Sequence, residues 1–125
     1  MSLVLIVDDE QAICWGLAEL VREMGHEALT AASAEAGLEA ARRTPPQAVV
    51  LDVRLPGISG LEAMPRFREL LGGAPIVVIT AYGELSTAVA AVRNGAFDYL
   101  IKPFDLQTAE RAIRRALASS RTLLE

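Results

Sequence analysis

Short runs of apolar residues alternate along this chain with segments in which apolar residues recur every three or four positions. The runs Leu3–Val7, Ala48–Leu51 and Ile76–Ile79 are uniformly apolar, which is typical of buried strands, and they are too short for helices. The segment Glu27–Ala31 is a weaker strand candidate, and Phe97–Ile101 completes the set. The pattern therefore predicts five strands.

A helical pattern follows each predicted strand. In the first, Ile13, Leu17 and Leu20 recur at helical spacing, and Gly25 ends the helix. The second begins near a Ser33 cap and cannot continue through the two prolines at positions 45 and 46. The remaining helices are predicted after the loop at 56–60 through Leu71, over residues 85–94, and from an Asp105 N-cap toward the C-terminus.

The regular alternation of strand and helix indicates the fold class. Strands that are apolar on both faces belong in a parallel sheet covered by helices on each side, so an α/β fold is predicted. The crossovers must be right-handed, which leaves few topologies, but periodicity does not fix the order of the strands. A length of 125 residues, without repeats or an internal linker, fits a single domain over residues 1–125.

Composition and charge limit the cellular compartment and the partners expected for this domain. No apolar stretch reaches the roughly 18–20 residues of a membrane span, and the N-terminus lacks the features of a signal peptide. We therefore expect a cytoplasmic domain without a membrane partner. The single cysteine, Cys14, cannot form an internal disulfide and is expected to be a small buried residue. A net charge of −4 argues against direct nucleic-acid binding by this domain.

Residues that can do chemistry follow four of the predicted strands. In open parallel sheets, binding sites form outside the carboxyl ends of the strands. The residues at these ends are Asp8, Asp9 and Glu10 after the first strand, Asp52 after the third, Thr80 after the fourth and Lys102 after the fifth.

Each of these residues also has a purely structural interpretation. Asp8 or Asp9 could cap the first helix, and Glu10 could favour its macrodipole. Asp52 could begin a turn, the hydroxyl could cap a helix, and the lysine could be a solvated charge. Caps alone, however, would not place carboxylates, a hydroxyl and an ammonium together at one edge of the sheet. The conjunction favours a functional site.

The residue types suit phosphoryl transfer with a divalent cation. Two carboxylates ~4 Å apart repel by roughly 4 kcal/mol at an effective dielectric constant of about 20, and a cation removes that penalty. Oxygen ligands favour Mg²⁺. Phosphoryl transfer depends on positioning and on positive charge around the phosphoryl oxygens. Asp52 could be the nucleophile, Lys102 could supply charge beside the metal, and Thr80 could donate a hydrogen bond.

These residues lie in four segments that together resemble the motifs of two-component response-regulator receiver domains, the CheY-like superfamily. The segments are Val7-Asp8-Asp9-Glu10, Leu51-Asp52-Val53-Arg54-Leu55-Pro56-Gly57, Ile79-Thr80-Ala81 and Lys102-Pro103-Phe104. They follow the family's order and spacing over nearly the whole chain. The resemblance implies a flavodoxin-like parallel sheet with strand order 2-1-3-4-5 and helices on both faces. Strands 1 and 3 would then be neighbours, which would bring Asp8, Asp9 and Asp52 together.

The same resemblance implies a ligand set and a phosphoryl donor. Asp52 would be the phosphoacceptor, Asp9 and Asp52 would bind Mg²⁺ directly, and Asp8 would act through a water molecule. The backbone carbonyl of Arg54 would complete the protein ligands. The donor would be a phosphohistidine on a sensor histidine kinase or a small phosphodonor, and the domain would promote its own phosphorylation and dephosphorylation.

Thr80 and Tyr99 match the family's switch pair. The resemblance implies that Thr80 moves toward the phosphoryl group and that Tyr99 rotates inward into the vacated space. An ordinary half-buried strand aromatic is the alternative for Tyr99. The face formed by the fourth helix, the fifth strand and the fifth helix would then carry the output.

A finer resemblance points to receivers of the NtrC class. It rests on Thr80-Ala81-Tyr82-Gly83-Glu84 and on Gly95-Ala96-Phe97-Asp98-Tyr99-Leu100. In that class the receiver precedes an AAA+ ATPase and a DNA-binding domain in sigma-54-dependent activators of transcription. Neither domain lies in this chain. A stand-alone receiver is the alternative, and an aspartyl-phosphate phosphatase or phosphotransferase is a third reading, although such enzymes usually carry a cap that 125 residues leave no room for.

Three further expectations concern single segments. The fifth helix is predicted to run past the domain core, with a linker helix beginning at about residues 118–125. Its residues Ile113, Leu117, Ser120 and Leu124 have the spacing of a coiled-coil seam, which predicts weak or phosphorylation-dependent homodimers. The Lys102–Pro103 peptide bond is expected to be cis. Trp15 is expected to be a packing residue.

Overall fold

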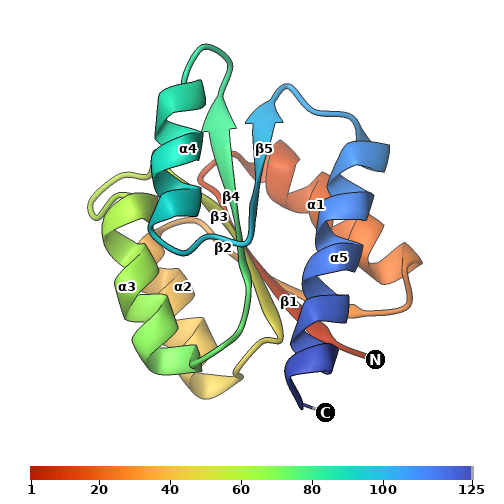
Figure 1. The fold of residues 1–125 in the computed structure, drawn as a ribbon. Coiled ribbons are helices and arrows are strands. Elements are labelled where there is room, and N and C mark those ends of the chain that lie inside the picture. The colour runs from red at the N-terminus through yellow and green to blue at the C-terminus, as the bar shows by residue number, and fades with distance from the viewer. Residues whose placement is uncertain (125) are drawn as a thin grey trace.

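The computed structural model of the protein describes the backbone of residues 1–124 and the side chains of residues 1–119. Within that range, five strands and five helices alternate along the chain (Figure 1). The strands are β1 (Leu3–Val7), β2 (Glu27–Ala31), β3 (Ala48–Asp52), β4 (Ile76–Ala81) and β5 (Asp98–Lys102). The helices are α1 (Gln11–Glu23), α2 (Ala34–Arg43), α3 (Gly60–Leu71), α4 (Leu85–Arg93) and α5 (Leu106–Leu124).

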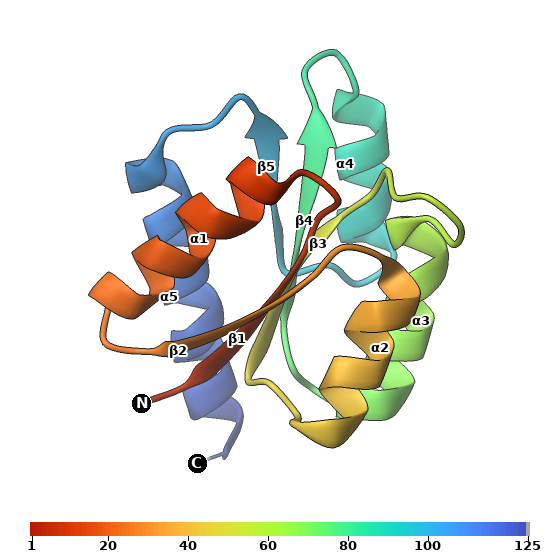
Figure 2. The same ribbon diagram turned by 180° about the vertical axis from the view of Figure 1, so that it is seen from behind.

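The strands form one parallel sheet in the order β2-β1-β3-β4-β5, which confirms the predicted fold class and strand order. β1 and β3 are neighbours, with Val7 opposite Leu51. β4 and β5 are neighbours as well, with Ala81 opposite Lys102. The carboxyl ends of these four strands therefore lie at the same edge of the sheet, as the reverse view shows (Figure 2).

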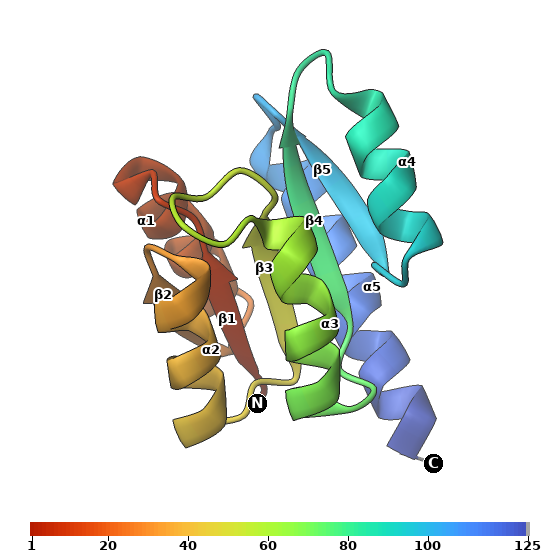
Figure 3. The ribbon, with the colours of Figure 1, turned by 90° about the vertical axis from the view of Figure 1, so that its left-hand side faces the viewer.

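Helices cover both faces of the sheet, with α1 and α5 on one face and α2, α3 and α4 on the other (Figure 3). The alternation of side chains along β1 explains this arrangement. Val4 and Ile6 pack toward α1 and α5, whereas Leu5 and Val7 pack toward α2 and α3, and all four are fully buried. Among the residues that the structure describes, no helix combines the length and apolar character that a membrane span requires.

Side-chain caps fix the starts of three helices. The Ser33 hydroxyl accepts the N–H of Ala36 at the start of α2, as the sequence predicts. Asp105 accepts the N–H of Thr108 at the start of α5, which confirms the predicted cap. At the start of α3, Ser59 forms a reciprocal capping box with the glutamate three residues later. These bonds set where each helix leaves the edge of the sheet that carries the site.

Gly60 allows the start of α3 to approach the end of β3 closely. A Cβ atom at this position would lie 2.1 Å from the carbonyl oxygen of Asp52, far inside van der Waals contact. The N–H of Gly60 donates to the carbonyl of Val53 at 2.9 Å. A larger residue at position 60 would therefore displace the backbone around Asp52.

The backbone of α5 is helical to Leu124, but the predicted association seam is wrong for its first two members. Ile113 and Leu117 are only 1% and 6% exposed and pack in the core beside α1. They are therefore not available to a second chain. The side chains of Ser120 and Leu124, the other members of the predicted seam, lie outside the described residues. A linker helix beginning at about residues 118–125 stays a prediction.

Candidate functional site

Three carboxylates meet at the carboxyl edge of the sheet. Asp8 and Asp9 follow β1, Asp52 ends β3, and one oxygen from each lies within 4.8 Å of the other two. Asp8 and Asp52 are buried, whereas Asp9 is exposed. The structure therefore brings together the three acidic residues that the sequence predicts for the site.

The carboxylate of Asp52 is fixed by one contact at each oxygen. Its Oδ1 accepts the N–H of Arg54 at 3.0 Å, and its Oδ2 accepts a hydrogen bond from Nζ of Lys102 at 3.2 Å. The first bond turns the chain after β3, so that the backbone of Arg54 lies in the same turn as the carboxylate. A carboxylate held in one orientation is well suited to act as a nucleophile.

The charged form of Asp8 is disfavoured by its surroundings. Burial, and then the charge of Asp52, raise its pKa from 3.8 to about 6, although hydrogen bonds from the N–H of Glu10 and from Lys102 oppose the shift. The Glu10 N–H donates to Oδ1 at 2.8 Å. Oδ2 lies 3.1 Å from Nζ of Lys102 but accepts no hydrogen bond. A buried carboxylate oxygen in that state fits a site that receives a cation.

Lys102 lies between three carboxylates. Its Nζ is 2.6 Å from Glu10, 3.1 Å from Asp8 and 3.2 Å from Asp52. Burial lowers the pKa of the ammonium, but the hydrogen bonds to Glu10 and Asp8 and the charge of Asp52 outweigh it and raise the pKa above its ordinary value. Lys102 is therefore positively charged at neutral pH. The Lys102–Pro103 peptide bond that follows it is cis, as predicted.

Thr80 offers a buried hydroxyl at the end of β4. The residue is 1% exposed, and its Oγ1 has no hydrogen-bond partner among the described residues. Buried polar groups are rarely left unpaired, so this hydroxyl is available to a group that enters the site. In the register of β4 and β5, Thr80 is opposite Ile101, which places half-buried Tyr99 on the same face of the sheet. The movement predicted for this pair stays a prediction.

Comparison with known proteins identifies the family that shares this fold and these residues. The response regulator receiver domain family matches residues 4–114, which is most of the chain. The chain is a response regulator receiver domain.

Relatives of this receiver domain confirm the resemblance to the NtrC class. The regulatory protein AtoC of Escherichia coli is 38% identical over 117 residues, and the DNA-binding transcriptional regulator NtrC of the same organism is 34% identical over 117 residues. Each match covers 94% of this chain and 25% of the relative, so the chain spans about a quarter of their length. The crystal structure of NtrX from Brucella abortus is 34% identical with a TM-score of 0.92, and the match covers 97% of this chain and 28% of NtrX.

An ion pair that the sequence did not predict joins two loops of the receiver domain beside the site. The guanidinium of Arg54, in the loop after β3, pairs with the carboxylate of Glu84, the N-cap residue of α4. Because the N–H of Arg54 is also bonded to Asp52, this residue connects the candidate phosphoacceptor with the start of α4. Thirty residues separate the two partners in the sequence, so no local charge pattern indicates the pair.

Glu10 lies at the edge of the sheet where the sequence predicted it, but its contact with Lys102 was not predicted. The structural alternative gave Glu10 a role with the macrodipole of α1, and either Asp8 or Asp9 the role of its cap. Instead Glu10 is the N-cap residue, its side chain makes no capping bond, and its carboxylate contacts Lys102. Its position directly after the acidic pair was the only available signal.

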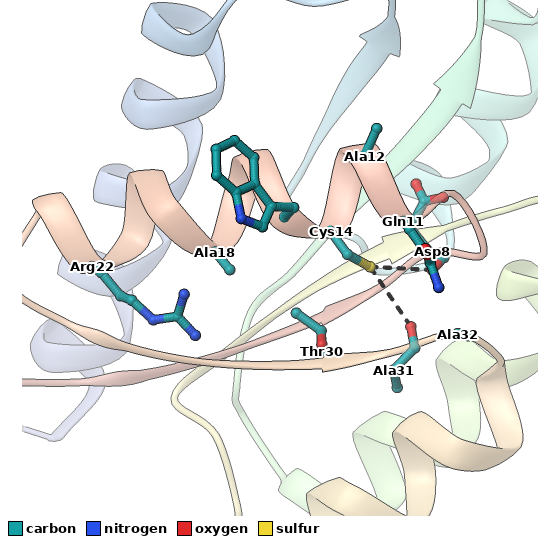
Figure 4. Close-up of a pocket in the computed structure, with 10 residues that line it drawn as sticks. Asp8, Gln11, Ala12, Cys14, Ala18, Arg22, Thr30, Ala31 and Ala32 are labelled. Carbon is teal, nitrogen blue, oxygen red and sulfur yellow. Dashed lines mark hydrogen bonds between the residues drawn. The ribbon is translucent and has the colours of Figure 1, made fainter.

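Trp15 differs from its prediction as a packing residue. Its side chain is 70% exposed and lines a hollow of about 800 Å³ between α1 and β2, the region drawn in Figure 4. Cys14 is buried as predicted, and its thiol donates to the backbone carbonyl of Asp8 at 3.2 Å. Burial, and then the charge of Asp8, raise the pKa of this thiol, so it stays neutral and unreactive at neutral pH.

Proposed function

We propose that this receiver domain accepts a phosphoryl group on Asp52 from the phosphohistidine of a sensor histidine kinase. The observation that carries the proposal is the contact of Lys102 with Asp52 inside the acidic cluster. It joins a fixed nucleophile to a cation that can neutralise the transferred group, which are the main requirements of phosphoryl transfer. The family match supports the same reaction class.

The acidic cluster fits a bound Mg²⁺. Oxygen atoms from Asp8, Asp9 and Asp52 lie close together, and an oxygen of Asp8 is buried without a hydrogen bond. Oxygen-only donors suit this hard cation, which commonly binds through one or two carboxylates and phosphate oxygens. In the proposed site Asp9, Asp52 and the backbone carbonyl of Arg54 would hold the ion directly, and Asp8 would act through water. The ion would neutralise negative charge on the phosphoryl oxygens.

In the proposed transfer, an oxygen of Asp52 bonds to phosphorus while the bond from phosphorus to the donor's imidazole nitrogen breaks. The imidazole leaves with the bonding electron pair, and an aspartyl phosphate forms. Lys102 stabilises the charge on the phosphoryl oxygens, and the unpaired hydroxyl of Thr80 donates a hydrogen bond to one of them. Attack of water on phosphorus later releases inorganic phosphate and restores the carboxylate.

The proposed output surface is the α4–β5–α5 face, on which α4 shifts while the core-packed part of α5 stays in place. Donation by Thr80 draws its side chain toward the phosphoryl group, and Tyr99 rotates inward behind it. Both residues lie on the face of the sheet that α4 covers. α4 exposes Leu85, Val89 and Val92, and a phosphorylation-dependent homodimer would cover these residues.

The proposed setting is a cytoplasmic regulator of the NtrC class. There the domain would control an AAA+ ATPase and a DNA-binding domain in sigma-54-dependent transcription, with α5 leading into the linker at about residues 118–125. The support is the similarity to NtrC and AtoC, of which this chain spans a quarter. A stand-alone receiver or a different output domain is the alternative.

Acetyl phosphate with Mg²⁺ tests the phosphoacceptor. Mass spectrometry should find one hydroxylamine-labile phosphoryl group, on the peptide that contains Asp52, and the group should pass to no acceptor other than water. Asp52→Asn should abolish the labelling. Asp98→Asn is the matched control, since Asp98 begins β5 at the other end of the strand and should leave the labelling intact. Equal labelling of wild type and Asp52→Asn would contradict the assignment.

A further inference from the structure

The closest contact of Lys102 is with a residue that the proposed reaction does not use. Glu10 Oε1 lies 2.6 Å from Nζ, closer than either Asp8 or Asp52. We propose that Glu10 occupies, in the resting domain, the place on Lys102 that a phosphoryl oxygen takes after transfer, and that phosphorylation displaces it. Glu10 is thus a positioning residue that acts through Lys102. The inference rests on the proposed role of Asp52.

The number of donors on Lys102 limits how many anions it can hold. An ammonium has three N–H donors, and Lys102 faces three carboxylates. Nζ donates to Oδ1 of Asp8 at 3.4 Å, to Glu10 and to Asp52, so all three donors are engaged before any phosphoryl group arrives. To hold a phosphoryl oxygen, Lys102 must give up one of its present partners.

Burial decides which partner can leave. The side chains of Asp8 and Asp52 are 0% and 6% exposed, so losing the lysine would leave a buried charge uncompensated. The side chain of Glu10 is 59% exposed and makes no capping bond with α1, so its carboxylate can turn into water. Glu10 is the partner that exchanges at least cost.

The exchange also keeps the charge of Lys102 compensated in both states. Before transfer Glu10 supplies the third anionic partner, and after transfer the phosphoryl group supplies it. The new negative charge repels the Glu10 carboxylate and favours its departure. Removing that carboxylate should therefore favour the phosphorylated state, because Lys102 no longer has to break a contact.

Beryllofluoride, used with Mg²⁺ as a phosphoryl mimic, tests the exchange by a binding measurement. Glu10→Gln should bind beryllofluoride about two- to fivefold more tightly in calorimetry, the range expected for a partly exposed ion pair. Labelling of Asp52 by acetyl phosphate should accelerate by a similar factor. The same affinity as wild type, or a weaker one, would overturn the proposal.

Glu35→Gln is the matched control for loss of one negative charge. Glu35 is an exposed residue at the start of α2, on the same edge of the sheet, and its carboxylate accepts the N–H of Ile58 rather than contacting Lys102. Any effect of Glu35→Gln on beryllofluoride affinity should disappear near 1 M salt, where the Debye length is about 3 Å. The effect of Glu10→Gln acts through direct contact and should persist there. If high salt removed the effects of both substitutions, the result would contradict direct contact of Glu10 with Lys102.

The ammonium signal of Lys102 in NMR spectra distinguishes displacement of Glu10 by the phosphoryl group from a Glu10 that stays on Lys102 in both states. The exchange predicts that Glu10→Gln shifts this signal in the resting domain and leaves it unchanged in the beryllofluoride complex, where Glu10 has already left. A Glu10 that only supports Lys102 would change the signal in both states, which would overturn the proposal. Failure of wild type to label at Asp52 would instead refute the proposed function.

Discussion

The two helices that flank β5 are anchored to the sheet in different ways. The buried side chains of α4 are only Ala88 and Ala91, and its larger apolar residues face solvent. Over residues 106–119, whose side chains are described, α5 buries two large side chains in addition to three alanines, namely Ile113 and Leu117 with Ala109, Ala112 and Ala116. Because apolar burial supplies most of the stabilisation, α4 is held by less free energy than α5. The difference in packing therefore favours movement of α4 over movement of α5.

The proposed switch residues lie on the side of the sheet where the helix is less firmly packed. Thr80 and Tyr99, the proposed switch pair, lie on the face covered by α4. A single polar tether, the ion pair of Arg54 with Glu84, holds the start of α4 to the loop after β3. A small change at Asp52 could therefore reach α4 without disturbing the core beside α5.

The contrast predicts a large difference in stability loss between truncation of an apolar side chain in α5 and in α4. Ile113→Ala should lower the free energy of unfolding by about 2–5 kcal/mol, because it leaves a cavity under α5. Val89→Ala, at a 40% exposed site in α4, should change it by less than about 0.5 kcal/mol. Urea unfolding of the two variants measures both values. Similar losses would show that the helices are anchored alike.

Asp8 carries a buried charge at the end of β1, and its effect on the free energy of unfolding depends on pH. A pKa raised from 3.8 to about 6 means that the folded state keeps the proton longer, so stability falls as pH rises through that window. Without Mg²⁺, Asp8→Asn should therefore be more stable than wild type at pH 7 by roughly 2–3 kcal/mol.

That gain should shrink as pH falls below about 6 and vanish only well below 3.8, where the carboxyl is protonated in both states. Thermal unfolding in EDTA across this range is the measurement. A gain that is independent of pH would show that burial of the charge is not its cause.

The smallest effect concerns the tether of α4. Glu84→Gln removes its ion pair with Arg54 and should loosen α4 by about 0.2–1 kcal/mol, the value of a partly exposed pair. Hydrogen exchange of α4 amides should rise accordingly, by roughly 1.4- to fivefold. Glu110→Gln is the control, because it breaks an exposed pair with Arg114 within α5. An equal rise in α4 exchange for both variants would show that the Arg54–Glu84 pair does not hold α4 in place.

Periodicity predicted most of the fold because uniform apolar runs mark buried strands. Leu3–Val7 and Glu27–Ala31 were predicted with the observed bounds, whereas β4 continues two residues beyond the apolar run, to Ala81. β5 begins at Asp98 and ends at Lys102, one residue later than predicted at each end. Strand pairing extends these bounds through polar residues, which a hydropathy pattern cannot indicate. The strand order came from the family resemblance.

The site residues could be predicted because strand ends meet at one edge, but their contacts could not. Glu10 and Glu84 contact partners that are distant in sequence, and such contacts depend on the finished fold. The exposure of Trp15 could have been predicted, because it lies two residues before Leu17 and thus about 200° away around α1. The coiled-coil spacing of Ile113 and Leu117 was misleading because a buried face has the same spacing as a seam.

Hydrogen exchange with and without phosphorylation of Asp52 tests the central claim most directly. The account predicts that phosphorylation changes exchange in α4 and in the loop before it, leaves residues 106–117 of α5 unchanged, and has no effect in Asp52→Asn treated identically. Identical exchange of phosphorylated and unphosphorylated wild type, or the same change in Asp52→Asn, would contradict it.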